Sequence, residues 1–194
     1  MFLTRLSSGL DRISSGWTLL AAVALYGFFL STVMPGQARD SRAYAGDWGG
    51  PDQHFFYTPG ELYEHIPAWP AAGRSDYIRF RLGWDIGWAF IYTAFLVIAT
   101  SLSLRRAYPA AHPRRLLNLP ALIPGLLDLA ENAVGIVLVA NADTRLDALA
   151  WFATSLTSAK WTTLAMAHLV LLYAAGAALL ATIRSRRADA ADQR

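Results

Sequence analysis

The chain has 194 residues, of which 55% are hydrophobic and 16% are charged, and it contains no cysteine. Soluble domains average roughly 25% charged residues, so this composition indicates an integral membrane protein. The lack of cysteine excludes disulfides, thiolate metal sites and a cysteine nucleophile. The net charge of +3 comes from arginines that flank apolar runs. This pattern is typical of membrane topology signals and does not support nucleic-acid binding.

The first of four long apolar runs covers residues 17–34 and follows a short polar segment, residues 1–16. The run is longer than the roughly 7–15 apolar residues of a signal-peptide core. Its length favours a retained membrane-spanning helix over a cleaved signal, although Gly36-Gln37-Ala38 has the small residues of a weak cleavage site.

Residues 35–81 form the longest segment between apolar runs, and we expect an extracytoplasmic cap loop of roughly 45 residues there. Thr58 and Glu61 have the spacing of a capping box, which predicts a short helix over residues 59–65. Farther on, Ser75-Asp76 is expected to cap a helix that leads into the second span.

The second span is predicted over residues 82–104 and the basic cytoplasmic loop after it over residues 105–115. Asp85 lies in the first turn of this span, where the helix dipole favours a carboxylate with its head in water. Asp85 also shares a helical face with Tyr92, so the carboxylate can instead face the third span.

The third span, residues 116–140, contains Asp128, Glu131 and Asn132 in the middle of an apolar run. Because these residues are spaced i, i+3 and i+4, their side chains project from one helical face. A charged group at the centre of a bilayer costs about 2.5–3.5 kcal/mol or more. We therefore expect neighbouring helices to supply partners, or one carboxyl group to be protonated.

An outer connector over residues 141–159, with a short interfacial helix, precedes the fourth span over residues 160–183. Lys160 begins this span and His168 lies well inside it. The tail, residues 184–194, is expected to be disordered.

Basic residues flank the N-terminus, the second connector and the C-terminus. The positive-inside rule then predicts that both termini are cytoplasmic. The Ala- and Arg-rich composition without glycosylation sequons suits a bacterial inner membrane.

The sequence thus predicts an all-α integral membrane protein, a four-transmembrane-helix bundle in which polar residues form one intramembrane pocket. We expect this pocket to bind or transform a lipid-like or amphipathic small molecule, without a cofactor or a metal. The candidate catalytic groups are Asp128, Glu131 and His168. The candidate ligand-binding groups are Asp85, Tyr92, Asn132 and Lys160.

Two alternatives stay open. Pairing of Lys160 with Asp85, and of His168 with Glu131, would make the polar groups structural links in a non-enzymatic membrane subunit or scaffold. A column of polar groups would also suit a proton or cation pathway. The bilayer is the expected partner, and the sequence leaves open whether the chain also forms a homo-oligomer.

A further group of acidic and histidine residues lies in the cap loop, but its spacing matches no zinc or calcium motif. The chain also contains no nucleotide-binding or hydrolase motif. The members of the cap group are Asp52, His54, Glu61, Glu64 and His65.

Overall fold

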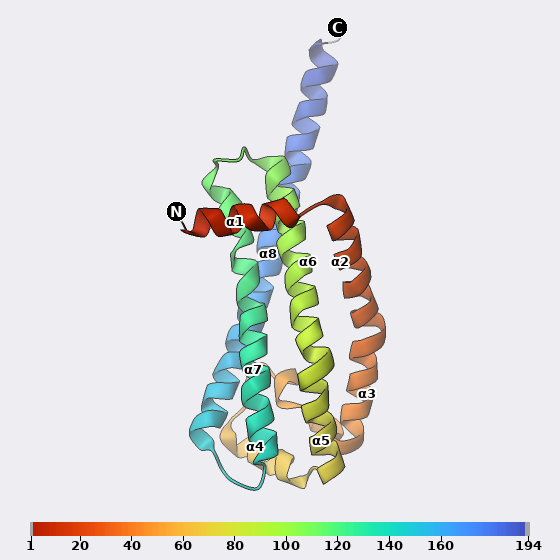
Figure 1. Ribbon diagram of the computed structural model, residues 1–194, viewed down its shortest axis with the longest axis vertical. Coiled ribbons are helices and arrows are strands. Elements are labelled where there is room, and N and C mark those ends of the chain that lie inside the picture. The colour runs from red at the N-terminus through yellow and green to blue at the C-terminus, as the bar shows by residue number, and fades with distance from the viewer. Residues whose placement is uncertain (1, 193–194) are drawn as a thin grey trace.

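The computed structural model describes residues 2–192, which are mostly helical and contain no strand. Four segments are long and apolar enough to cross a membrane, which indicates an integral membrane protein. They run along the long axis of the molecule, and both ends of the chain lie at the same end of the bundle (Figure 1). These segments are Gly16–Trp48, Ala71–Ala107, Pro113–Ala140 and Asp147–Ala191.

The first segment continues beyond the predicted span. α2 (Gly16–Phe28) passes through a π-helical turn, Phe29–Val33, into α3 (Met34–Ala45). Pro35 is the second residue after the π-helical turn, and this wider turn accommodates its ring and its missing N–H. The first part of the predicted cap loop is therefore helical.

The predicted short helix is present as α4 (Pro59–His65). The backbone N–H of Thr58 donates to Glu61 Oε2 at 2.7 Å, and the backbone N–H of Glu61 donates to Thr58 Oγ1 at 3.2 Å. The hydrogen bond from the Thr58 backbone holds the pKa of the Glu61 carboxyl group below its usual value. Its stabilising effect is present above the ordinary pKa and is lost as the pH falls through the lowered pKa.

Replacing Thr58 with alanine is expected to destabilise the start of α4 by about 1 kcal/mol, because one helix N–H loses its acceptor. Hydrogen–deuterium exchange in detergent should become faster over residues 60–63 and stay unchanged in the membrane-length helices. Thr58→Ser keeps the hydroxyl and is the matched control. Equal exchange in Thr58→Ala and wild type would contradict the role of the cap.

α5 (Ala71–Phe80) begins directly after Pro70, so the predicted cap at Ser75-Asp76 was wrong. Pro70 has extended backbone angles, φ −62° and ψ 153°, and fixes the start of the helix. A second π-helical turn, Arg81–Asp85, joins α5 to α6 (Ile86–Ala107). The last part of the predicted cap loop is thus continuous with the second span.

The third segment begins with two 3₁₀ turns, Pro113–Asn118 and Pro120–Leu122, and continues as α7 (Ile123–Ala140). α7 approaches α6 closely at Gly125, because a Cβ atom there would lie 2.1 Å from Thr93 Oγ1. This close approach brings the polar face of α7 against α6.

α8 (Asp147–Asp192) is one continuous helix. The predicted break between an interfacial helix and the fourth span was wrong, because residues 147–175 contain no proline or glycine to interrupt the helix. The tail that we expected to be disordered is helical through Asp192, and residues 193–194 lie outside the described range.

The two ends of the bundle are covered differently. Residues 46–70 close one end, and α1 (Phe2–Ile13) lies across the other (Figure 1). A buried apolar cluster attaches the segment 46–70 to α7 and α8. Its members are Tyr57, Leu62, Ile66, Trp69, Tyr77, Leu138, Val139, Ala142, Ala150 and Ala153.

Candidate functional site

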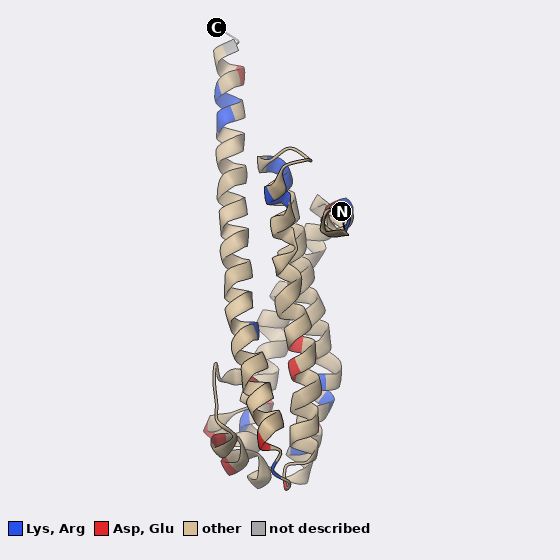
Figure 2. Cartoon of the chain, turned by 90° about the vertical axis from the view of Figure 1, so that its left-hand side faces the viewer, with Lys and Arg blue, Asp and Glu red and all other residues tan. Residues whose placement is uncertain are grey.

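Charged residues lie within the bundle, in the half that residues 46–70 cover (Figure 2). Their side chains form two groups of ion pairs. They come from α7, from α8, from the π-helical turn before α6 and, through Asp52, from the segment 46–70. Each of the following is at most 7% exposed: Arg81, Asp85, Asp128, Glu131, Asn132 and Lys160.

Lys160 is the cation of the first part of this buried cluster. Its Nζ donates to Glu131 Oε2 in a short contact and lies 3.4 Å from Asp128 Oδ1. The Thr157 hydroxyl donates to Glu131 Oε1, and the Tyr92 hydroxyl donates to Asp128 Oδ2 at 3.1 Å. Glu131 is therefore fully engaged, whereas Asp128 keeps a long contact with its cation.

Arg81 is the cation of the second part, and its side chain is only 2% exposed. Its Nη1 donates to Asp85 Oδ2 at 2.5 Å and to Asn132 Oδ1 at 2.9 Å, and its Nη2 pairs with Asp52. The guanidinium carbon lies 4.8 Å from the centre of the Tyr77 ring. Arg81, in the π-helical turn before α6, thus links the segment 46–70 to α7.

The structure brings together all the predicted site residues except His168. The ring of His168 is half-buried, and its Nδ1 lies 2.8 Å from the Leu164 carbonyl oxygen of the same helix. Since His168 and Lys160 are eight positions apart on α8, they are separated by about 12 Å along the helix axis. His168 therefore does not make the pair with Glu131 that the structural alternative required.

The Lys160–Asp85 pair of the same alternative is not formed either, because Asp85 pairs with Arg81 and Lys160 pairs with Glu131. Arg81 was missed because the second span was started one residue too late. Its i, i+4 spacing to Asp85 is the signal that could have found it. Asp52 was considered only for a metal in the cap loop, and residues 2–192 contain no group of three or more His, Cys, Asp or Glu that could hold a metal ion.

The buried cluster contains more carboxyl groups than cations. Asp52, Asp85, Asp128 and Glu131 face Arg81 and Lys160, so two negative charges are in excess when every group is ionised. Uncompensated charge is costly away from water. The cluster therefore favours a further positive charge, either protons or a bound cation.

A cavity of about 250 Å³, the inner pocket, lies directly against the cluster. Asp128 and Lys160 line it, whereas Glu131 does not. The inner pocket is bounded by charged and by aromatic side chains. The charged ones are Asp52, Arg81, Asp85, Asp128 and Lys160, and the aromatic ones are Trp88, Tyr92 and Trp161.

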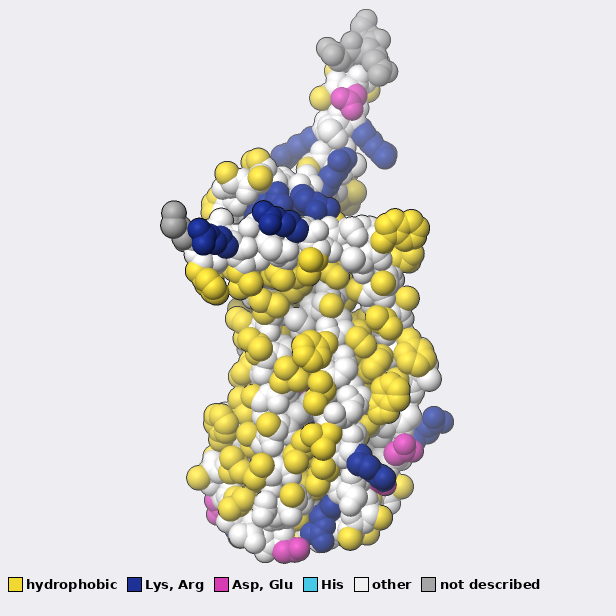
Figure 3. Space-filling view, viewed as in Figure 1, with side chains coloured by type: hydrophobic (Ala, Val, Ile, Leu, Met, Phe, Trp, Pro, Cys, Tyr) yellow, Lys and Arg dark blue, Asp and Glu magenta, His cyan; other side chains and the backbone are white. Residues whose placement is uncertain are grey.

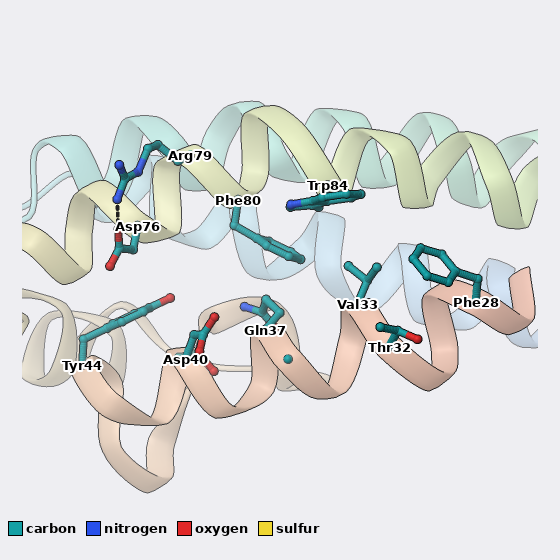
Figure 4. Close-up of a pocket in the computed structure, with 12 residues that line it drawn as sticks. Phe28, Thr32, Val33, Gln37, Asp40, Tyr44, Asp76, Arg79, Phe80 and Trp84 are labelled. Atoms are coloured by element: carbon teal, nitrogen blue, oxygen red, sulfur yellow. Dashed lines mark hydrogen bonds and ion pairs between the residues drawn. The ribbon is translucent and has the colours of Figure 1, made fainter. Parts of the chain in front are cut away.

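A second cavity, the lateral cleft, measures about 590 Å³ and lies between α2–α3 on one side and α5–α6 on the other (Figure 4). One end of it is apolar and is lined by Phe28, Val33 and Trp84. The other end is polar and contains Asp40 and the paired side chains of Asp76 and Arg79. Gln37 of α3 lines both cavities, so the two adjoin at that residue.

The polar cluster does not continue along the bundle axis in the described residues. A buried apolar layer that includes Leu96, Val97 and Ala121, all at most 3% exposed, lies next to Tyr92. The next buried polar pair, in which Asn118 Nδ2 donates to Ser101 Oγ at 3.0 Å, lies beyond it. The site is thus a pocket at one end of the bundle.

Fold and site together define a class of protein, a helical bundle of membrane-spanning length with a buried ion-pair cluster beside a pocket. Comparison with protein-family models, with curated proteins and with solved structures gave no match for this chain.

Proposed function

We propose that the inner pocket binds an amphipathic small molecule whose polar group is positively charged, such as a protonated amine. The observation that carries this proposal is the excess of carboxyl groups in the buried cluster, three of which, Asp52, Asp85 and Asp128, line the pocket. A bound cation compensates this excess and removes the cost of unpaired buried charge.

The aromatic lining supports the same ligand chemistry. Trp88, Tyr92 and Trp161 line the pocket together with the carboxylates. The faces of aromatic rings attract cations, by about 2 kcal/mol where water is excluded. Tyr92 also orients Asp128 through its hydroxyl.

The lateral cleft supports the amphipathic part of the proposal. Its apolar end offers the aromatic rings of Phe28 and Trp84 to a hydrocarbon chain (Figure 4). In a membrane this cleft would be reached from the lipid. Gln37 then marks the point where a ligand passes from the cleft to the pocket.

Within this proposal Asp128 anchors the cation, because it lines the pocket and its contact with Lys160 is long. Lys160 and Glu131 hold α8 against α7. A pocket is favoured over a proton or cation pathway because the apolar layer around Leu96 separates the cluster from the other end of the bundle.

We further propose that the bundle spans a membrane of the bacterial inner-membrane type, with both termini cytoplasmic and residues 46–70 as the extracytoplasmic cap. The basic residues at the end where the termini lie support this orientation (Figure 2).

Dodecylamine, dodecanol and dodecanoate test the proposal, since they share a chain and differ in charge. Purified protein in a nonionic detergent should be stabilised by the amine, by about 2.7 kcal/mol at a concentration 100 times the Kd. Tryptophan fluorescence should change with the same saturation, because Trp88 and Trp161 line the pocket. Equal responses to all three compounds would overturn the requirement for a cation. Native mass spectrometry of the same preparation would identify any ligand that is retained.

A further inference from the structure

α1 is attached to the bundle along one face only. Ser7 Oγ donates to the Arg115 carbonyl oxygen at 3.2 Å, and Asn118 Nδ2 donates to the Ser7 carbonyl oxygen at 3.3 Å. Asp11 pairs with Arg115 at 2.5 Å, and Arg105 Nη1 donates to the Asp11 carbonyl oxygen at 3.1 Å. These contacts hold α1 across the end of the bundle (Figure 1).

A second face of α1 is apolar and exposed. Phe2 is 75% exposed, Leu6 37% and Ile13 60%. With 100° between successive residues of an α-helix, these three side chains lie within one narrow sector. Figure 3 shows hydrophobic side chains gathered along the side of this helix that faces down the bundle.

The third face of α1 is basic. Arg5 and Arg12 are exposed and lie about 100° from the apolar sector. In Figure 3 basic side chains follow the upper side of this helix. More arginines lie at the same end of the bundle, in the connector after α6 and late in α8. These are Arg105, Arg106, Arg114, Arg115, Arg184, Arg186 and Arg187.

We propose that α1 lies in the headgroup layer of the membrane and binds the phosphate groups of anionic lipids. Its apolar face enters the boundary of the acyl chains, and Arg5 and Arg12 remain at the level of the phosphates. The order of the faces favours a bilayer over a protein partner, because the apolar face points along the spans and the basic face points away from them. This inference is independent of the ligand of the inner pocket.

Nanodiscs of phosphatidylcholine, with and without phosphatidylglycerol, test it on the whole protein. Hydrogen–deuterium exchange over α1 should be slower when phosphatidylglycerol is present. In the double variant Arg5→Gln/Arg12→Gln the protection factor of α1 should fall roughly fivefold for each arginine removed. It should also retain fewer phosphatidylglycerol molecules in native mass spectrometry.

The matched control is Arg39→Gln/Arg42→Gln, which removes two exposed arginines from α3 at the other end of the bundle. This control should keep the protection of α1. Exchange that does not depend on phosphatidylglycerol in the wild type would overturn the proposal. A dependence that survives in Arg5→Gln/Arg12→Gln would overturn it as well. Melting temperatures of both variants report whether the bundle itself has changed.

Discussion

Replacing Lys160 with methionine is expected to lower the free energy of unfolding by about 3–5 kcal/mol, which is the cost of leaving buried charge without its partner. Methionine keeps most of the apolar stem of lysine. However, Glu131 and Asp128 would then face each other without the Nζ that now contacts both. Arg81 cannot replace it, because it is already paired with Asp85 and Asp52. Thermal unfolding in detergent measures the effect.

Two further variants separate charge from packing. Lys160→Arg keeps the positive charge and should retain most of the stability. In Lys160→Met/Glu131→Gln the carboxylate that contacts Lys160 most closely is neutralised together with the cation, so the double variant should melt above Lys160→Met. If Lys160→Met melted like the wild type, the buried cluster would not be held by this ion pair.

Replacing Asp128 with asparagine is expected to leave the stability unchanged or to raise it, and to weaken the binding of the ligand. Asparagine can still accept the hydrogen bond from Tyr92, and Lys160 retains Glu131. Because carboxyl groups are in excess, the melting temperature without ligand should stay the same or rise. The affinity for dodecylamine should fall at least about thirtyfold, since removing one partner of a buried charge pair costs roughly 2–5 kcal/mol.

The matched control for this substitution is Asp143→Asn, which removes a carboxylate whose side chain is 77% exposed and does not line the pocket. It should bind dodecylamine like the wild type. A marked fall in the melting temperature of Asp128→Asn would show that Asp128 is a structural link, and the proposed binding site would then be wrong. Unchanged binding would exclude Asp128 as the anchor of the cation.

The local features of this protein could be predicted from its residues alone. The apolar runs are long enough to produce four membrane-length helices, and the Thr58–Glu61 pair together with Pro59 starts α4 at the predicted residue. Length, hydropathy and capping depend on residues within a few positions of one another. The i, i+3, i+4 spacing likewise placed Asp128, Glu131 and Asn132 on one buried face.

The partners of these side chains depend on how each helix is rotated and shifted against the others. Helical spacing does not specify that rotation, so the sequence could not show that Lys160 contacts Glu131 and not Asp85. The π-helical turn at Arg81–Asp85 inserts an extra residue into its helical turn and brings a guanidinium into the bundle. His168 lies outside the site because it is eight residues beyond Lys160 on α8, which places it about 12 Å farther along the helix axis.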